Sequence, residues 1–460
     1  MERSDRKKVS LSLYDTATRK TMPVISTLGK TRMYCCGPTV YRDAHVGNLR
    51  TFLLSDLVRR VLESHGNTVE LIQNITDVGH MSDDFEAEDK MLAQAKTEAM
   101  DPFAVARKYE QKFHIDLNRL NVKPADKFPR ASESIELMLV MIAQLIEKEY
   151  AYVGDDGSVY FDARSVESYG AISGNRLDAL KPGHRYEYSE DGAKRFHADW
   201  ALWKAAGARS EMIWDSPWGP GFPGWHIECS AMSLHYLDSH INVHVGGIDL
   251  RFPHHENERA QSNAITGNES VDLWLHGEHL LFEGRKMSKS AGNVVLLQDV
   301  IDRGLDPLAV RLCFLENRYR SQMDLTWAAI EAADALLKRW RKKIKVWKQS
   351  EVTEDLEFLA IIDNDLDTPR AIQYLRNIEK NDDLPDQASR FLYADKILGL
   401  DLNRIESEKT LTREQEELLE LRMNARKEKR WDDSDALRMK LEATGLEIKD
   451  SAKGQDWQWR

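Results

Sequence analysis

Two short segments of this 460-residue chain hold residue types suited to binding nucleotide phosphates. The first is HVGN, in which His45 can donate a hydrogen bond to a phosphate oxygen and Gly47 lets a base or ribose approach the backbone. The second is KMSKS, in which Lys286 and Lys289 are mobile point charges that can close over a triphosphate. A histidine that caps a surface helix, or an exposed basic loop, explains either segment taken alone. The two segments together are far more specific than either alone.

A second group of residues has the chemistry of metal ligands. His254 and Glu258 are four residues apart, so a helix would place them on one face. With Cys36 and Cys229 they make two thiolates, one imidazole and one carboxylate, a set that suits zinc. Spacing alone does not select this set, because the cysteines also suit a buried core and the helix also suits a surface. The two residues that follow His254 have ligand chemistry as well.

A strand, a helix and a second strand are predicted around the first segment. Residues 32–36 are predicted to form a strand that ends at a Gly-Pro turn. From His45 onward, apolar residues recur at helical spacing until Gly66, and residues 69–75 are predicted to form the next strand. Such a βαβ unit implies a parallel sheet, which binds ligands at the carboxyl ends of its strands. The HVGN segment therefore lies where a nucleotide would bind.

The rest of the chain divides by composition. Residues 120–222 are mixed, with scattered glycine and proline, and are predicted to be an insertion between two halves of the sheet. Strand-like alternation returns at 241–245, and the chain beyond about residue 322 is predicted to be helical as far as 440. The sequence thus predicts an α/β fold: a Rossmann-like parallel sheet split by an α/β insertion, followed by a helical bundle and a small C-terminal domain.

The composition is typical of a globular protein, with 42% hydrophobic and 30% charged residues. No run of apolar residues is long enough for a membrane span, and the first residues do not resemble a signal peptide. The four cysteines are too few for a disulfide framework, so we expect a cytoplasmic protein with reduced thiols and no membrane partner. The net charge of −12 excludes little, because residues 338–348 and 422–430 are basic. These runs are either solvated helix faces or contacts to RNA.

Six segments, taken in order, closely resemble the cysteinyl-tRNA synthetase family of class I aminoacyl-tRNA synthetases. They are MYCCGPTVY, HVGN, NITDV, PGWHIECSAMS, GGIDLRFPHHENE and KMSKSAGNVV. The resemblance covers nearly the whole chain, and GWHIECS and FPHHENE are the segments most specific to the family. It implies the following domains: the first half of the catalytic domain at 1–119, a connective insertion at 120–222, the second half at 223–275, a stem-contact region with KMSKS at 276–321, a helical bundle at 322–405 and an anticodon-binding domain at 406–460.

The resemblance also implies which residues act. One zinc ion per chain would be held by the matching positions Cys36, Cys229, His254 and Glu258, and it would bind the thiolate of substrate cysteine. Thr76 and Trp225 would help form the cysteine pocket. ATP, accompanied by Mg²⁺, would bind at Gly47, Asn48, Ser288 and Lys289, and the catalytic residues would be His45, Lys286 and Lys289, with His45 and Lys289 on the developing phosphate charge.

The implied reaction has two steps. ATP and L-cysteine give cysteinyl-adenylate and pyrophosphate, and the cysteinyl group then passes to the terminal adenosine of tRNA-Cys. Positioning and charge stabilisation carry chemistry of this kind. Serine has the same shape as cysteine, but its hydroxyl is a poor zinc ligand at neutral pH, whereas a thiol on zinc deprotonates. The zinc would therefore select the substrate, so no editing domain is expected. The resemblance separately implies a monomer, which is usual for the family.

The tail after Arg422 resembles the family's anticodon-binding domain. There the positions Arg426, Asp435, Asp450 and Trp457 would face the anticodon, through stacking and base-edge hydrogen bonds that suit splayed single-stranded bases. The alternative is a helical hairpin that only packs. This tail argues against the mycothiol-pathway cysteine ligase, which shares the zinc pocket and adenylation site but joins cysteine to an amino sugar and lacks the terminal domain.

Three positions depart from the family pattern. Asn48 replaces the second histidine of the usual HIGH string, residues 78–90 contain extra residues where an acidic pair is usual, and Gln455 replaces the usual threonine after Gly454. A third alternative is a degenerate synthetase that binds RNA or cysteine without catalysis. The intact HVGN and KMSKS segments and the complete ligand set argue against it.

Overall fold

The computed structural model describes residues 6–79, 89–179, 193–287, 292–348, 350–404, 412–451 and 454–459. The chain forms two compact units, Met1–Asn403 and Arg404–Arg460, each with its own core. None of the described helices is both long and apolar enough to cross a bilayer.

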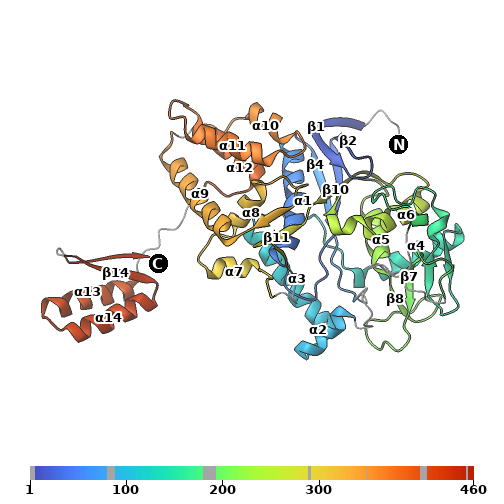
Figure 1. The fold of residues 1–460 in the computed structure, drawn as a ribbon, viewed down its shortest axis with the longest axis horizontal. Helices are drawn as coiled ribbons and strands as arrows, with labels where there is room; N and C mark the ends of the chain where they lie inside the picture. Colours follow the sequence, from blue (N-terminus) through green and yellow to red (C-terminus); the bar gives the residue numbers. More distant parts are fainter. Residues whose placement is uncertain are drawn as a thin grey trace. The chain divides into compact units, whose positions relative to one another are not determined.

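A six-stranded sheet forms the centre of the first unit (Figure 1). Its parallel part has the order β4-β3-β9-β10, with the bounds Thr68–Gln73, Lys30–Cys35, Ile241–Gly247 and Val271–Gly277. An antiparallel ribbon of β1 (Arg6–Asp15) and β2 (Lys20–Thr27) leads into β3. The sequence predicted the parallel strands but not this ribbon.

Helix α1 (Val46–Ser64) connects β3 to β4 and packs on the sheet. Its apolar residues recur at helical spacing and are buried, because the face that they form lies against the strands: Leu49, Phe52, Leu53, Leu57 and Val61. The predicted βαβ unit is confirmed, with strand bounds that differ from the prediction by one or two residues.

The chain between β4 and β9 first adds helices to the core of the parallel sheet and then builds a second layer with its own core. It contains α2 (Lys90–Glu98), α3 (Pro102–Arg119), α4 (Ile135–Glu147), the antiparallel strands β5 (Ala151–Val153), β6 (Val159–Phe161), β7 (Trp200–Ala205) and β8 (Gly221–Pro223), and α5 (Trp225–Tyr236). The rings of Phe161 and Trp200 stack 4.4 Å apart in its core. The predicted α/β insertion between the two halves of the parallel sheet is therefore confirmed.

After β9 come α6 (His254–Thr266) and β10, and then a small three-stranded sheet. Strand β11 (Leu280–Phe282) pairs with β12 (Arg285–Lys286) in antiparallel and with β13 (Met323–Leu325) in parallel orientation. Short helices α7 (Leu297–Asp302) and α8 (Leu308–Leu315) lie between β12 and β13 in the chain. The sequence analysis had not resolved this small sheet.

The predicted helical bundle consists of four helices in the described part of the first unit. They are α9 (Trp327–Val346), α10 (Leu356–Ile362), α11 (Thr368–Glu379) and α12 (Gln387–Leu398), and they lie on the opposite side of the parallel sheet from the insertion (Figure 1). Most of the basic run 338–348 lies on α9, and several of its cations are paired within the fold. Arg339 binds Glu379 at 2.7 Å, and the buried Arg341 binds Asp306 at 2.6 Å.

The second unit is a helical hairpin with a two-stranded ribbon. Its elements are α13 (Arg413–Lys427), α14 (Trp431–Ala443), β14 (Leu446–Ser451) and β15 (Gly454–Trp459). The core is small, so a buried ion pair contributes to it: the fully buried Arg422 binds Asp450 at 2.9 Å and Gln455 at 2.8 Å. The residue that replaces the usual threonine is thus part of this internal contact.

Candidate metal and nucleotide sites

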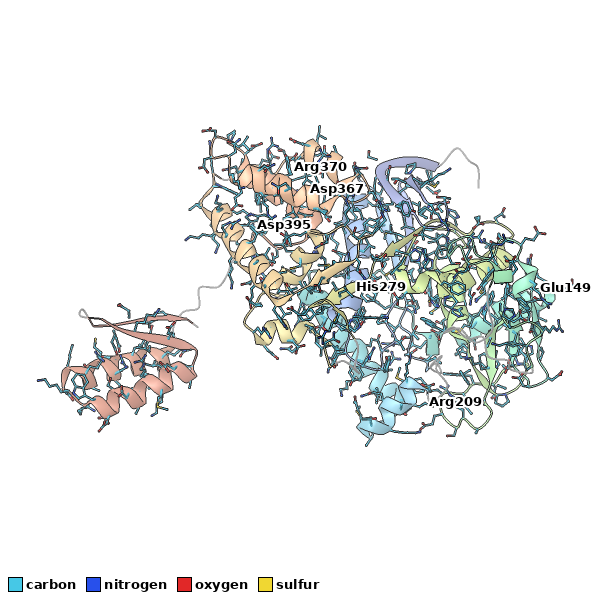
Figure 2. All side chains as sticks on the ribbon, in the orientation of Figure 1. Glu149, Arg209, His279, Asp367, Arg370 and Asp395 are labelled. Atoms are coloured by element: carbon cyan, nitrogen blue, oxygen red, sulfur yellow. The ribbon has the colours of Figure 1, made fainter. Side chains whose placement is uncertain are left out.

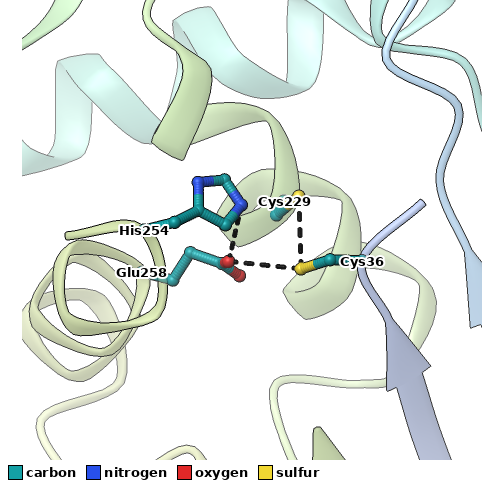
Figure 3. A group of neighbouring side chains, drawn as sticks. All are labelled: Cys36, Cys229, His254 and Glu258. Carbon is teal, nitrogen blue, oxygen red and sulfur yellow. Dashed lines mark hydrogen bonds and ion pairs between the residues drawn. The ribbon is translucent and has the colours of Figure 1, made fainter. Parts of the chain in front are cut away.

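Four side chains with ligand chemistry meet at the carboxyl end of β3 (Figure 3). Cys36 directly follows that strand, Cys229 lies in the second turn of α5, and His254 and Glu258 share one face of α6. None of the four exposes more than 4% of its surface. The shared helix face predicted from spacing is confirmed, and the fold brings both cysteines to it.

The separations of these atoms come within a few tenths of an ångström of those around a tetrahedral metal ion. Cys36 Sγ lies 3.9 Å from Cys229 Sγ and 3.4 Å from Glu258 Oε1, and His254 Nε2 lies 3.0 Å from the same oxygen. Bonds of about 2.0–2.3 Å to a tetrahedral ion would place ligand atoms roughly 3.3–3.8 Å apart. The other carboxylate oxygen, Glu258 Oε2, is buried without a hydrogen bond to the described residues and lies 3.5 Å from His244 Nε2.

Burial and mutual contact shift the ionisation of this group. Burial raises the pKa of Glu258 to about 8, although the Cys36 thiol and His226 oppose that effect. Burial, and then the neighbouring Cys229, raise the pKa of Cys36. Burial also disfavours the Cys229 thiolate, but hydrogen bonds with Cys36 and His254 outweigh it, so that the pKa of Cys229 falls. Negative charge at this point thus requires a cation to compensate it.

Cys36 and Glu258 also belong to a second possible ligand group, with His244 and His255. Cys36 Sγ lies 3.4 Å from His244 Nε2 and 3.3 Å from His255 Nε2. Burial lowers the pKa of both histidines well below the usual value, so both imidazoles are neutral at pH 7. Behind them, His255 Nδ1 lies 2.8 Å from His276 Nε2. Geometry alone permits either group to hold an ion.

The two residues predicted for the amino-acid pocket border the ligand group. Trp225 is the first residue of α5, and its ring stacks on His254 with centroids 4.1 Å apart. Thr76 is buried, and its hydroxyl accepts a hydrogen bond from Asn74 at 3.1 Å and donates one to Glu228 at 3.0 Å. Asn74 Oδ1 is in turn 3.6 Å from Cys229 Sγ, so one hydrogen-bonded chain joins Thr76 to the ligands.

Gly37 makes this arrangement possible. A Cβ atom on Gly37 would stand 1.5 Å from the carbonyl oxygen of Asn74, so only glycine lets the chain after Cys36 pass so close to the end of β4. The Gly37 N–H donates to Asn74 Oδ1 at 2.8 Å. The structure has no turn at Gly37-Pro38, where the sequence predicted one; the chain runs on beside β4, with Thr39 pairing in parallel with Thr76, and this close approach orients the ligand that precedes Gly37.

The insertion braces the helix that carries His254 and Glu258. Glu256 Oε2 accepts hydrogen bonds from the backbone N–H groups of Ile172 and Ser173, at 3.1 and 2.8 Å, and from the Ser173 hydroxyl at 2.9 Å. Glu256 lies between the two ligands in the sequence but points to the insertion instead. The insertion thus contributes to the position of the metal-binding face.

At the nucleotide motif, His45 caps the N-terminus of α1. Its Nδ1 accepts a hydrogen bond from the Asn48 backbone N–H at 3.2 Å, and the Asn48 side chain accepts one from the His45 N–H at 3.2 Å. Burial, and then Arg42, lower the pKa of His45 to about 4, so the ring is neutral. Because Nδ1 accepts, the proton is assigned to Nε2, which can donate to a ligand. Asn48, the departure from HIGH, thus completes a capping box.

The two predicted nucleotide segments contact each other. Val46 N donates to Val295 O at 3.0 Å, and a Cβ atom on Gly47 would stand 2.8 Å from Met287 Cε, inside the KMSKS segment. Lys286 is exposed at the end of β12. Ser288 and Lys289, the other predicted residues of this segment, lie outside the described residues.

The predicted anticodon residues lie in the second unit. Arg426 on α13 binds Asp450 on β14 at 3.1 Å, and Asp435 is exposed on α14. Trp457 on β15 is opposite Ile448 and is 40% exposed. All four elements of this unit thus contribute a polar or aromatic group.

Sequence reasoning missed the residues that support these sites. Its patterns gave no signal for Asn74, His244 or His276, because each lies in or next to a strand and reaches the site only through the sheet topology. Arg50 was missed as well, although it lies close to HVGN in the sequence. Its partners are backbone carbonyls, which leave no sequence pattern.

Comparison with known families gives two matches. A family model described as the class I (C) tRNA synthetase catalytic domain matches residues 23–335. A second, described as the cysteinyl-tRNA ligase anticodon binding domain, matches residues 408–460.

Similar proteins of known name cover almost the full chain. The cysteine–tRNA ligase of Thermus thermophilus is 40% identical over 484 residues, which cover 98% of this chain and 99% of the relative. That of Chlorobaculum tepidum is 38% identical, with 97% and 99% covered. Among solved structures, the Mycobacterium tuberculosis methionyl-tRNA synthetase in complex with methionyl-adenylate has a TM-score of 0.52 and 15% identity over 81% of this chain and 90% of the other. That last likeness concerns the fold alone.

The contact between the two nucleotide segments predicts the effect of enlarging Gly47. We expect Gly47→Ala to weaken ATP binding by about tenfold, because the new methyl group would displace Met287 or the His45 ring. Isothermal titration with ATP would measure this. Met287→Ala in the Gly47→Ala background should restore part of the affinity, relative to Met287→Ala alone. The same weak binding in the double variant would contradict the steric explanation.

Proposed function

The chain belongs to the cysteinyl-tRNA synthetase family of class I aminoacyl-tRNA synthetases, and we propose on that basis that it ligates L-cysteine to the 3′ end of tRNA-Cys with ATP. Cysteine is first activated to cysteinyl-adenylate, and the cysteinyl group is then transferred to the terminal adenosine. The observation that carries this proposal is the buried group of Cys36, Cys229, His254 and Glu258. Its first member, Cys36, directly follows β3, the strand that precedes the nucleotide helix α1.

The ion proposed for this group is a single zinc. Two thiolates, one imidazole and one carboxylate favour it over harder cations, and the second ligand group offers only one thiolate. When bound, zinc would coordinate the substrate thiol and favour its thiolate, which a serine hydroxyl does not match. A cavity of the right shape discriminates such close analogues only about a hundredfold. The remaining selectivity would come from this donor set, with Trp225 and Thr76 forming the pocket around it.

The nucleotide site is proposed to act by hydrogen bonding and charge. The neutral His45 ring offers Nε2–H to a phosphate oxygen, and the N-terminus of α1, with Gly47 and Asn48, favours the triphosphate. Lys286 and Lys289 would neutralise the charge that develops as pyrophosphate leaves, with Ser288 shaping their loop and Mg²⁺ accompanying ATP. No side chain is assigned as a general base.

The partner assignments rest on the same family membership. Residues 408–460 match an anticodon-binding domain, and we propose that Arg426, Asp435, Asp450 and Trp457 face the anticodon. Residues 276–321 and the insertion at 120–222 are proposed to contact the acceptor stem. We propose a monomer in a reducing cytoplasm, where the four free cysteines stay reduced.

The anticodon-domain match distinguishes this proposal from a ligase that joins cysteine to an amino sugar. Such an enzyme would need the zinc and ATP sites but not a terminal domain for tRNA. The deciding experiment is the transfer of labelled cysteine to total tRNA with ATP and Mg²⁺, compared with labelled serine. We expect charging with cysteine that fails without ATP, and at least a thousandfold lower charging with serine. Cysteine activation without charging would instead favour a small amine acceptor.

The choice between the two ligand groups predicts a difference in metal content. His254→Asn should lose most of the tightly bound zinc, whereas His244→Asn should retain about one equivalent, because His244 belongs only to the second group. Elemental analysis of both variants, together with circular dichroism to verify folding, would measure this. The reverse result would move the ion to the His244 and His255 side of Cys36.

The anticodon assignment predicts an effect confined to tRNA. Arg426→Ala should raise the KM for tRNA by roughly tenfold, and leave ATP–pyrophosphate exchange unchanged, because it removes a cation that an RNA base or phosphate would contact. Lys440→Ala, which removes an exposed cation of α14, is the control. Equal effects of the two variants would reduce the role of Arg426 to general charge.

A further inference from the structure

The side chain of Arg50 joins the nucleotide helix to two other segments. Arg50 lies on α1 close to HVGN and is 5% exposed. Its Nη1 donates to Glu278 O at 2.7 Å and to His279 O at 3.1 Å, and its Nη2 donates to Arg318 O and to Ser321 O, both at 3.0 Å. All four acceptors are backbone carbonyls, so the contact fixes main chain rather than side chains.

These carbonyls precede β11 and β13, which pair with each other. Strand β11 also pairs with β12, the strand that leads into the KMSKS segment. Residues 278–279 lead into β11, and residues 318–321 lead into β13. The two segments are joined to each other, because Glu278 N donates to Tyr319 O at 2.8 Å. His279, labelled in Figure 2, therefore lies where the Arg50 guanidinium binds both of these segments.

A series of contacts runs from this junction through β11 and β12 to the predicted catalytic residue Lys286 and back to α1. Strand β11 pairs with β12, which ends at Lys286, and the next residue, Met287, packs against Gly47 on α1. Arg50 holds the residues that precede β11, and Gly47 contacts Met287, which follows β12. Burial lowers the pKa of Arg50 only to about 10, so the guanidinium keeps its charge and all its donors at pH 7.

We propose that Arg50 is a positioning residue for adenylate formation, which holds the strand pair that carries Lys286 at a fixed place against the N-terminus of α1. The proposal rests on the function proposed above. Arginine suits this role because its planar guanidinium has five N–H donors in a fixed arrangement, whereas a lysine ammonium has three and no planar geometry. Displacement of a reacting group by about 1 Å can cost a hundredfold in rate.

The test compares Arg50→Lys with Arg341→Lys. Arg341 is also buried and donates to two backbone carbonyls, Asp401 O and Leu400 O, both at 3.1 Å, but it does so in the helical bundle. Both substitutions remove guanidinium hydrogen bonds to backbone carbonyls, and Arg341 also forms an ion pair with Asp306 at 2.6 Å, so the loss of thermal stability in Arg341→Lys should be at least as large as in Arg50→Lys. Arg50→Met provides a second variant, without the charge.

Two readouts are expected to separate the variants. Amide hydrogen exchange of a peptide spanning 278–287 should accelerate at least tenfold in Arg50→Lys and stay unchanged in Arg341→Lys. The kcat of ATP–pyrophosphate exchange should fall by roughly ten- to a hundredfold in Arg50→Lys alone, with the KM for cysteine and the zinc content unchanged.

The outcomes distinguish this proposal from the proposed function. Unchanged exchange of the 278–287 peptide, or equal acceleration in both lysine variants, would overturn the positioning role. So would accelerated exchange with an unchanged kcat. If the unsubstituted protein formed no cysteinyl-adenylate, the proposed function would fail, while the hydrogen-exchange comparison would still decide whether Arg50 holds the segment.

Discussion

The burial of two thiols, an imidazole and a carboxylate at one point is the constraint on which the first unit depends. Each such group loses several kcal/mol of hydration when it is ionised away from water, unless a cation or a full set of hydrogen bonds compensates. The neighbouring His244 and His255 add no positive charge, because burial lowers their pKa values. The arrangement thus favours one cation and leaves few ways to satisfy the ligands without it.

The end of β3, α5 and α6 must meet for that group to form. The end of β3 and α6 are each held by contacts outside the group. Gly37 allows the chain after β3 to pass against Asn74, so Cys36 is placed by backbone packing. Helix α6 is held by Glu256, which binds backbone N–H groups of the insertion. The insertion is therefore part of the support for the metal-binding face.

The sequence predicted local structure well and tertiary support poorly. The helical spacing after His45 and the four-residue spacing of His254 and Glu258 follow directly from the period of a helix, and both are confirmed. The association of Cys36 with Cys229 depends on strand order, which no local pattern encodes, so it came only from the family resemblance. His276 and Arg50 escaped prediction for a similar reason, since their partners are a distant ring and the main chain.

One residue of the ligand group, Cys36, is separated from the nucleotide motif only by the loop between β3 and α1. Cys36 is the first residue of that loop and His45 is the last. Their supports differ, however: the insertion braces the ligand group through Glu256, whereas the Arg50 side chain of α1 braces the nucleotide side through hydrogen bonds to backbone carbonyls. Changes in α5 or α6 could therefore alter which side chain the pocket accepts without moving the phosphate-binding groups. A shared loop with separate supports would let one scaffold keep its adenylation chemistry while its choice of amino acid changes.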